Sequence, residues 1–365
     1  MKYNNIRRKT REVAVGTLKI GGKNPIAIQS MTNTDTLNIE ATVDQVRRLE
    51  RAGCDVVRIS VPSVEAAYTV CKIKEAGIRV PIVADIHFDY RIALRCAELG
   101  FDKIRINPGN IGDEDRVRAV CEACKERRIP IRIGVNSGSL EKDILAKYGA
   151  PTPDALCESA LYHIMLLEKF HFYDTLISIK ASTVSDMIAA NRLLAAKCDY
   201  PLHLGVTEAG GGNRGLLKSA VGIGALLCDG IGDTVRVSLT DDPLEEIYAA
   251  KQILRAVGIE GQSGLDIVSC PTCSRTKIDL IPLAKRFEAA VKEAQLEDVP
   301  VKVALMGCVV NGPGEAREAD VGIAGGMGEA VLFRHGEIVE KIPENEIIER
   351  LLREIRNLRD RKQHE

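Results

Sequence analysis

The chain has 365 residues, 50 Lys and Arg against 51 Asp and Glu, and a hydrophobic fraction of 45%. This length exceeds one ordinary domain and suits a barrel of about 250 residues followed by a smaller domain. The near-zero net charge, the absence of Trp and an aromatic fraction of only 4% argue against binding to nucleic acid or to an anionic membrane.

The N-terminal segment MKYNNIRRKTREV contains no apolar core of the kind that a signal peptide needs. No apolar run approaches the roughly 18–20 residues of a membrane span. We therefore expect a cytoplasmic protein. In a reducing compartment its 11 cysteines should be free thiols, and any close group of them is a candidate metal site.

Eight short segments rich in Val and Ile, each followed by a helix-like stretch, make up the chain as far as Gly258. The predicted strands are IAIQSMT from Ile26, DVVRISV from Asp55, PIVADIH from Pro81, KIRINP from Lys103, PIRIGVN from Pro130, LISIKAS from Leu176, PLHLGVTE from Pro201 and TVRVSLT from Thr234. Alternating strands and helices predict a parallel sheet, and eight such units close a (β/α)₈ TIM barrel. The alternative is a doubly wound open sheet, but no Gly-rich fingerprint follows the first strand.

The pattern changes after Gly258, where the polar stretch IEGQSGLD is a plausible linker. Beyond it we predict a helix from about Ile281 to Leu296, the strands VKVALMG, VGIAGG, AVLFRHG and EIVEKI, and a charged final helix. The sequence thus predicts an α/β protein in which residues 1–258 form a substrate-binding barrel and residues 259–365 form a smaller α+β domain.

Polar residues occupy one face of most predicted strands, because side chains two residues apart share a face. The shared-face pairs are Arg58 with Ser60, Asp85 with His87, Arg105 with Asn107, Arg132 with Asn136, His203 with Thr207, and Arg236 with Ser238. If these faces point inward, five cations converge near the C-terminal end of the barrel: Arg58, Arg105, Arg132, Lys180 and Arg236. Uncompensated buried charge is costly, so this arrangement predicts a polyanionic ligand, most economically a diphosphate.

Two carboxylates and two histidines accompany these cations. Asp85 and Glu208 cannot neutralise five cations, but both are candidates for proton transfer or for holding substrate hydroxyls. His87 and His203 are weaker candidates, since a single histidine on a strand is more often structural.

The cysteines fall into two groups. Cys121 and Cys124 form a CxxC inside a helical stretch with no third ligand nearby, and we expect them to pack as core residues. Cys270 and Cys273 form a CxxC in a predicted loop, and Cys308 opens a second, Gly/Pro-rich loop. Three thiolates on irregular backbone suit an iron–sulfur cluster, with zinc or a redox disulfide as alternatives.

The identity of a fourth ligand follows from what these loops contain. There is no fourth cysteine in the second domain, and His335, the partner that a zinc site would need, is distant in sequence. An oxygen from the Cys308 loop is more plausible, and Glu315 is the candidate.

Several motifs of this sequence resemble those of the 4-hydroxy-3-methylbut-2-enyl diphosphate synthase family, the iron–sulfur enzymes of the non-mevalonate isoprenoid pathway. The motifs are CPTC, MGCVVNGPGEAREADVGIAGG, QSMTNTDT, ADIHF, IRINPGNIG, RIGVNSGSL, HLGVTEAG and GIGDTVRVSLTDDP. The similarity extends from about Lys9 to Leu352, in the compact two-domain bacterial form. This chain has Gln262 and Ser263 where some members carry arginines.

The resemblance implies an oxidoreductase with a [4Fe-4S] cluster that converts 2-C-methyl-D-erythritol 2,4-cyclodiphosphate to 4-hydroxy-3-methylbut-2-enyl diphosphate. Electrons come from reduced flavodoxin or ferredoxin. The implied cluster ligands are Cys270, Cys273, Cys308 and Glu315. The implied substrate-binding residues are Arg105, Arg132, Lys180, Arg236, Ser238 and Asn311, and the implied catalytic residues are Glu208, Asp85, Arg58 and Asn136.

The predicted last helix of the barrel, from about Pro243 to Val257, bears on the oligomeric state. It must run antiparallel to the eighth strand and carries the chain roughly 20 Å away from the ligand-binding end. The second domain is then attached at the wrong end to reach its own pocket easily. We therefore expect a head-to-tail homodimer in which each cluster covers the partner's barrel, and the resemblance implies the same.

Overall fold

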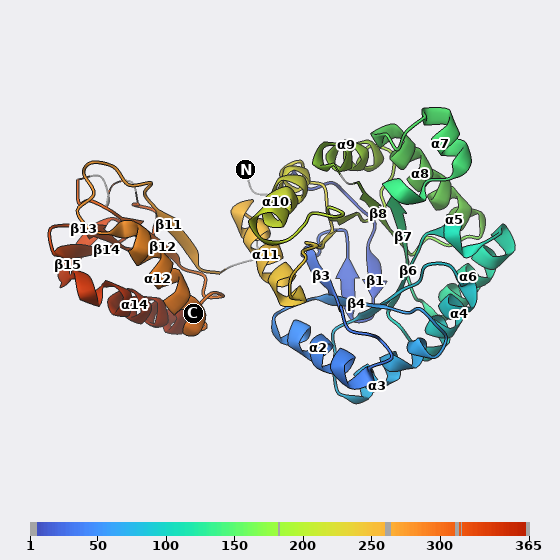
Figure 1. Ribbon diagram of the computed structural model, residues 1–365, viewed down its shortest axis with the longest axis horizontal. Coiled ribbons are helices and arrows are strands. Elements are labelled where there is room, and N and C mark those ends of the chain that lie inside the picture. The colour runs from blue at the N-terminus through green and yellow to red at the C-terminus, as the bar shows by residue number, and fades with distance from the viewer. Residues whose placement is uncertain (1–5, 182, 260–263, 311–313, 315, 363–365) are drawn as a thin grey trace. The chain divides into compact units, whose positions relative to one another are not determined.

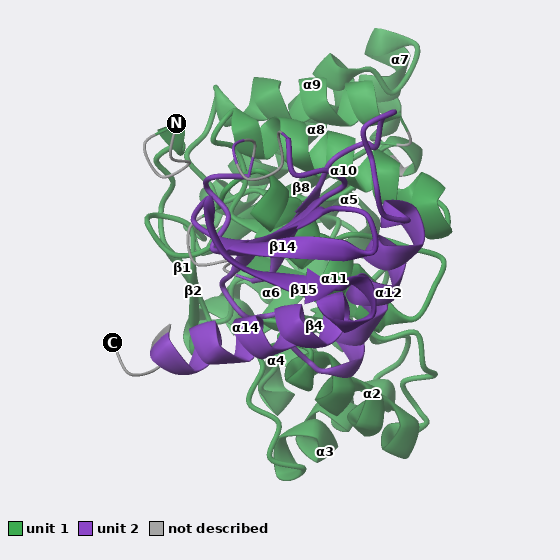
Figure 2. Cartoon of the chain, turned by 90° about the vertical axis from the view of Figure 1, so that its left-hand side faces the viewer, with its two compact units in different colours: residues 1–260 green, residues 261–365 purple. Residues whose placement is uncertain are grey.

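The computed structural model describes residues 6–181, 183–259, 264–310, 314 and 316–362. The chain divides into two compact units, residues 1–260 and residues 261–365, which are coloured separately in Figure 2. Each unit is described by itself below.

The first unit is a parallel eight-stranded barrel, which confirms the predicted fold (Figure 1). Its strands are β3 (Ala27–Met31), β4 (Val56–Ser60), β5 (Ile82–Asp85), β6 (Lys103–Ile106), β7 (Ile131–Asn136), β8 (Thr175–Lys180), β9 (His203–Leu204) and β10 (Thr234–Val235). The hydrogen-bonded order is β8-β7-β6-β5-β4-β3-β10-β9. A parallel bridge between Ile177 and Leu202 joins the two ends of this order and closes the ring.

Helices surround the strands, as Figure 1 shows. They are α2 (Ile39–Arg51), α3 (Thr69–Glu75), α4 (Tyr90–Leu99), α5 (Pro108–Ile111), α6 (Glu114–Arg127), α7 (Lys142–Tyr148), α8 (Pro153–Lys169), α9 (Val184–Ala195), α10 (Gly212–Cys228) and α11 (Pro243–Ala256). Several begin where a side chain caps free backbone N–H groups; Asp113 caps α6 and Thr152 caps α8. Val, Ile and Leu from the outward strand faces pack against these helices and form the main core.

An N-terminal hairpin, which the sequence analysis did not predict, precedes the barrel. Its strands β1 (Val13–Val15) and β2 (Leu18–Ile20) pair antiparallel. Val13, Val15 and Ile20 are buried with Ala27 and Leu176, which lie at the amino ends of β3 and β8. The hairpin therefore covers the end of the barrel opposite the predicted ligand site.

Helix α11 runs from the carboxyl ends of the strands toward their amino ends. Near its start, Glu246 pairs with Arg236, which follows β10. Five residues farther on, the Lys251 Nζ lies beside Gly53, in the loop that leads into the amino end of β4. The described part of the first unit thus ends, at Ile259, on the side away from the carboxyl ends of the strands.

The second unit contains a five-stranded sheet in the order β11-β12-β13-β14-β15. Its elements are β11 (Asp266–Ser269), α12 (Leu280–Glu293), β12 (Lys302–Met306), β13 (Val321–Gly325), β14 (Glu329–Arg334), β15 (Glu337–Pro343) and α14 (Ile347–Lys362). Strands β11, β12 and β13 are parallel, and the rest are antiparallel. The predicted elements are present, and the structure adds β11, which the sequence does not predict because this short strand follows directly on the polar linker pattern.

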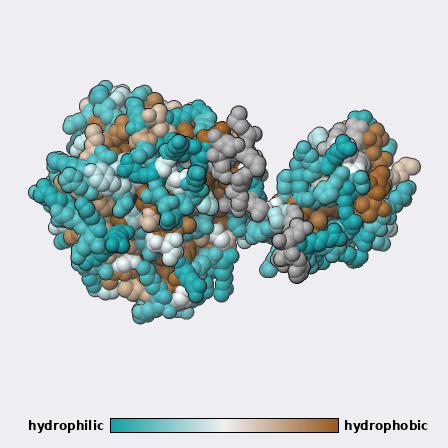
Figure 3. Space-filling model, turned by 180° about the vertical axis from the view of Figure 1, so that it is seen from behind, coloured by the Kyte–Doolittle hydropathy of each residue, from teal (hydrophilic) through white to brown (hydrophobic). Residues whose placement is uncertain are grey.

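Within the described ranges, no helix combines the length and apolar character that a bilayer span requires. Hydrophilic residues cover most of the face of the first unit seen in Figure 3.

Candidate functional site

Five cationic side chains gather inside the barrel at the carboxyl ends of its strands. Strand register brings them together: Asp85 pairs with Arg105, Arg105 with Arg132, and Asn136 with Lys180. The Lys180 ammonium is repelled by the positive charges of four arginines, which are Arg58, Arg105, Arg132 and Arg236. We call this group, Arg58, Arg105, Arg132, Lys180 and Arg236, the cationic mouth.

Asp85 is the central carboxylate of the cationic mouth. Its side chain is almost fully buried, lies 3.1 Å from the Arg105 Nη1 and lies 3.8 Å from the Arg58 Nε. Burial raises the pKa of Asp85, but the attraction of Arg58 and Arg105 outweighs burial and lowers the pKa to about 2. Asp85 is therefore ionised at neutral pH and neutralises part of the mouth, so it is poorly suited to donate a proton.

Glu246, on α11, is a second buried carboxylate that the sequence analysis missed. It forms two contacts of 3.2 Å with the Arg236 guanidinium and accepts a hydrogen bond of 2.8 Å from the Ser30 hydroxyl. Its residue is only 3% exposed. Arg236 is therefore held in place by a bidentate ion pair before any ligand arrives.

Arg132 and Lys180 have no such neutralisation. Arg132 is 1% exposed, and neither it nor Lys180 forms an ion pair with a carboxylate in the described part of the chain. Burial, followed by nearby cations, lowers the pKa of both groups well below their ordinary values. Since arginine keeps its charge in proteins, this destabilisation is relieved by an anion.

Two glycines provide the space for these side chains. A Cβ on Gly134 would lie 2.6 Å from the Arg105 Nε, and a Cβ on Gly205 would lie 3.0 Å from the Lys180 Nζ. Gly134 and Gly205 take inward positions on β7 and just after β9. The absence of side chains there lets long cationic groups fold across the barrel interior.

The remaining predicted barrel residues surround the mouth. Asn136, at the end of β7, and Ser238, three residues after β10, are partly exposed. The His87 Nε2 lies 3.9 Å from the Asp85 Oδ2. Glu208 is exposed in the loop after β9 and has a backbone φ of 54°. This left-handed conformation is unfavourable for glutamate, and such strain is concentrated at functional sites.

His203 does not reach the mouth. It is 0% exposed and its Nδ1 is hydrogen-bonded to the Thr234 hydroxyl deep in the barrel. Burial and the charges of Arg132 and Lys180 lower its pKa well below the ordinary value. His203 is thus a neutral interior residue below the mouth and lies too deep to contact a ligand there.

The three cysteines of the second unit come from the ends of two neighbouring parallel strands. Cys270 follows β11 and its backbone N–H donates to the Leu305 carbonyl of β12, three residues before Cys308. The loop that contains Cys273 folds back, because the Lys277 N–H donates to the Gly307 carbonyl. A Cβ on Gly307 would lie 2.8 Å from Thr276, so this close approach requires glycine.

Hydrogen-bond donors lie beside two of these sulfurs, those of Cys270 and Cys273. The Gly307 N–H donates to the Cys270 Sγ at 3.2 Å. Backbone and side-chain hydrogen bonds from Arg275 lower the pKa of Cys273. Thr272, between the two cysteines, has a left-handed φ of 64°. Backbone N–H donors and a lowered thiol pKa are features of an iron–sulfur ligand loop.

The structure does not bring a complete ligand set together. Among the described residues, no three His, Cys, Asp or Glu side chains are arranged to hold a metal ion. Glu315 and Asn311, and also Gln262 and Ser263, lie outside the described residues. The donor set of three thiols, together with the N–H group directed at Cys270, is chemically compatible with a cluster.

The other CxxC has a different environment. Cys121 and Cys124 are buried on α6, and burial raises the pKa of Cys121 to about 12. A thiol that is buried and protonated is a poor metal ligand, which agrees with the prediction that this pair belongs to the core.

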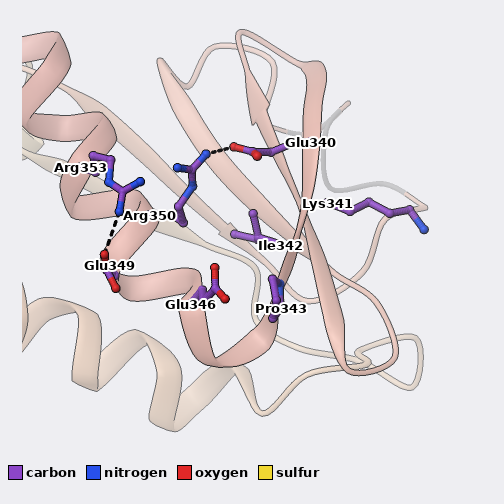
Figure 4. Close-up of a pocket in the computed structure, with 8 residues that line it drawn as sticks. All are labelled: Glu340, Lys341, Ile342, Pro343, Glu346, Glu349, Arg350 and Arg353. Atoms are coloured by element: carbon purple, nitrogen blue, oxygen red, sulfur yellow. Dashed lines mark hydrogen bonds and ion pairs between the residues drawn. The ribbon is translucent and has the colours of Figure 1, made fainter.

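A separate hollow of about 220 Å³ lies between β15 and the start of α14 (Figure 4). Its arginines are already paired, Arg350 with Glu340 and Arg353 with Glu349. None of the predicted site residues lines it.

Comparison with known proteins agrees with both units. The GcpE TIM-barrel domain matches residues 10–251, and the GcpE protein C-terminal domain matches residues 266–357. A protein of Caldanaerobacter subterraneus subsp. tengcongensis is 56% identical over 353 residues, covering 97% of this chain and 98% of its own length. A protein of Clostridium perfringens is 56% identical over 354 residues, covering 96% and 99%.

Both relatives are named 4-hydroxy-3-methylbut-2-en-1-yl diphosphate synthase (flavodoxin). Among solved structures, dihydropteroate synthase from Stenotrophomonas maltophilia is 16% identical, with a TM-score of 0.49, and covers 68% of this chain and 98% of its own. Both GcpE domains match this chain, and more than half of the aligned positions are identical to these two relatives over nearly the full length. This chain therefore belongs to the GcpE family.

Proposed function

We propose that this chain is a cytoplasmic enzyme that reduces 2-C-methyl-D-erythritol 2,4-cyclodiphosphate to 4-hydroxy-3-methylbut-2-enyl diphosphate. The reaction opens the ring, consumes two electrons and two protons, and releases one oxygen as water. The observation that carries the proposal is the cationic mouth, in which the buried Arg132 and Lys180 lack carboxylate partners within the described residues. A diphosphate supplies the missing negative charge.

The barrel residues bind and orient this substrate. Arg105, Arg132, Lys180 and Arg236 donate to phosphate oxygens, together with Ser238, and Asp85 holds Arg58 and Arg105 in position. Asn136 is placed next to Lys180 by strand register and can hold a substrate hydroxyl. Glu208, at the rim, is the residue that we assign to proton transfer, because Asp85 stays ionised.

Cys270, Cys273 and Cys308 would hold a [4Fe-4S] cluster, with Glu315 as the fourth ligand, and Asn311 would bind substrate. When bound, such a cluster supplies electrons one at a time and offers one iron as a Lewis acid. The chain's own part is to donate the Gly307 N–H to the Cys270 Sγ and to lower the pKa of Cys273 through hydrogen bonds from Arg275. Reduced flavodoxin, which the relatives' names include, or ferredoxin is the proposed electron donor.

We also propose that the active form is a homodimer whose sites are shared between chains. Within the first unit, α11 leads away from the cationic mouth, and its last described residue, Ile259, lies beyond the end of that helix. Only residues 260–265 separate Ile259 from β11. A second chain is the economical source of the cluster for each mouth.

The function is tested with anaerobically purified full-length protein. We expect about four irons and four sulfides per chain, and conversion of the cyclodiphosphate in the presence of reduced flavodoxin. A colourless zinc protein without this activity would instead indicate the alternative metal site.

The cationic mouth makes a prediction about binding. Arg132→Ala and Lys180→Ala should each weaken substrate affinity roughly ten- to a hundredfold, or about 1.5–3 kcal/mol, because each removes a charge-assisted contact. Calorimetry with the cyclodiphosphate measures this effect. Arg95→Ala, at an exposed ion pair on α4, is the matched control and should bind normally.

Removing the buried charge of Arg132 should raise the stability of the protein even though it weakens substrate binding. Arg132→Met keeps an apolar side chain in the barrel and removes a buried charge, so its melting temperature in the absence of ligand should rise while affinity falls. Unchanged affinity in all three mouth variants would contradict the proposed binding site.

Glu208 makes a separate prediction about catalysis. Glu208→Gln should lower kcat by roughly a hundredfold or more and change KM by only a few fold, because it removes proton transfer but keeps shape. Steady-state kinetics under anaerobic conditions measure both constants, with Glu98→Gln on α4 as the control. An unchanged kcat would mean that Glu208 is only a rim residue.

A further inference from the structure

A second layer of polar groups lies below the cationic mouth. Lys103 on β6 is two residues before Arg105 and therefore points to the same, inward side of the strand. Lys103 is 0% exposed, and so is His203, its neighbour in the barrel interior. The function proposed above uses neither Lys103 nor His203.

Lys103 has little to stabilise a positive charge. Its Nζ lies 3.4 Å from the Gln29 Oε1, a neutral and weak partner. The structure gives it no ion pair with any carboxylate among the residues it describes, since Asp85 on the adjacent strand pairs with Arg58 and Arg105 instead. The other polar group of this layer, His203, is bonded to Thr234 and leaves its Nε2 without a partner in the described part of the chain.

The charges around Lys103 are all positive. Arg132 on β7 and Arg58 on β4 are the cations that disfavour protonation of Lys103. The same two cations, together with Lys180 on β8, disfavour protonation of His203. Burial, and after it Arg132 and Arg58, lower the pKa of Lys103 well below the ordinary lysine value. In the absence of a ligand, this environment therefore disfavours the protonated form of the Lys103 amine.

A diphosphate in the mouth weakens this positive field. Its two negative charges would offset the cations that now repel a proton from the Lys103 amine. We propose that Lys103 takes up one proton from solvent when a diphosphate binds above it, so that ligand binding and proton uptake are coupled. The step forms one N–H bond, makes no bond to the ligand and needs no other reactant. It rests on the proposed function, since it requires the diphosphate at the mouth.

Calorimetry can count the protons. The cyclodiphosphate is titrated into oxidised, anaerobic, cluster-loaded protein in two buffers that differ in ionisation enthalpy, without an electron donor. Each phosphorus of this cyclic ligand carries one ester oxygen, one bridging anhydride oxygen and a single ionised oxygen whose charge does not titrate near neutral pH, so any proton uptake belongs to the protein. We expect Lys103→Met to take up about one proton fewer than wild type.

The affinity should show the same coupling. Because binding takes up a proton, rising pH opposes it, and Kd should increase by up to about tenfold per pH unit from this group alone. Lys103→Met and Lys103→Gln should each lose that part of the slope, and Lys103→Gln keeps a polar partner for Gln29 if the apolar variant fails to fold. Lys72→Met, the same substitution at an exposed lysine on α3, is the matched control and should behave as wild type.

The outcomes separate the two proposals. Tight binding with equal proton uptake in wild type and both Lys103 variants overturns the inference and leaves the proposed function intact. Loss of the proton in His203→Gln but not in the Lys103 variants overturns the assignment to Lys103. Failure of wild type to bind the cyclodiphosphate overturns the proposed function and the inference with it.

Discussion

Cys270→Ser is expected to bleach the anaerobically purified protein and to abolish its activity. Cys270 accepts a hydrogen bond from the Gly307 N–H and lies beside β12, which leads to Cys308. A serine hydroxyl is not deprotonated at neutral pH and is a much weaker ligand for iron than a thiolate. The measurements are visible absorbance, iron and sulfide content, and turnover with reduced flavodoxin.

The matched control is Cys121→Ser in the other CxxC. Cys121 is 1% exposed on α6, so this variant should lose some stability but keep its spectrum and its turnover. The assignment of the cluster to the second unit would be wrong if Cys121→Ser were colourless and Cys270→Ser were not.

Mixing two inactive variants is expected to restore activity. One variant carries Arg132→Ala and Glu208→Gln in the barrel, and the other carries Cys270→Ser in the cluster loop. If each site combines one chain's barrel with its partner's cluster, every mixed dimer has one fully intact site and one doubly damaged site. Random exchange makes half of the dimers mixed, so an equal mixture should recover about a quarter of wild-type activity.

The control mixture combines Cys270→Ser with Cys273→Ser. All cluster ligands come from one chain in the proposed arrangement, so this mixture should stay inactive. Mixed dimers of the barrel and cluster variants, isolated with two different affinity tags, allow a decisive measurement. If these dimers are inactive, the site is built within one chain and the shared arrangement is wrong.

The sequence by itself determined the fold of the first unit and the chemical character of its interior. Alternation along short strands placed Arg58, Asp85, Arg105 and Arg236 on inward faces, because a strand's side-chain period of two is a local property of the backbone. Local sequence context likewise distinguished the Cys270 loop from the pair on α6, since one CxxC lies in a helical pattern and the other in a loop pattern with Cys308 as a third cysteine.

The alternation of side chains along a strand could also have predicted one further interior residue. Lys103 is two positions before Arg105, so the alternation that places Arg105 inside the barrel also places Lys103 there. How deeply it lies, with only Gln29 for a partner, depends on barrel closure and could not be derived from one strand.

Only the tertiary structure decided which charges neutralise one another. Glu245 and Glu246 stand together at the start of a helix, and nothing local shows that Glu246 is the buried partner of Arg236 and Ser30. The same holds for the space that Gly134 and Gly205 leave for cationic side chains. Ion pairing and close packing join residues from different strands and helices, and their geometry exists only after the ring of strands has closed.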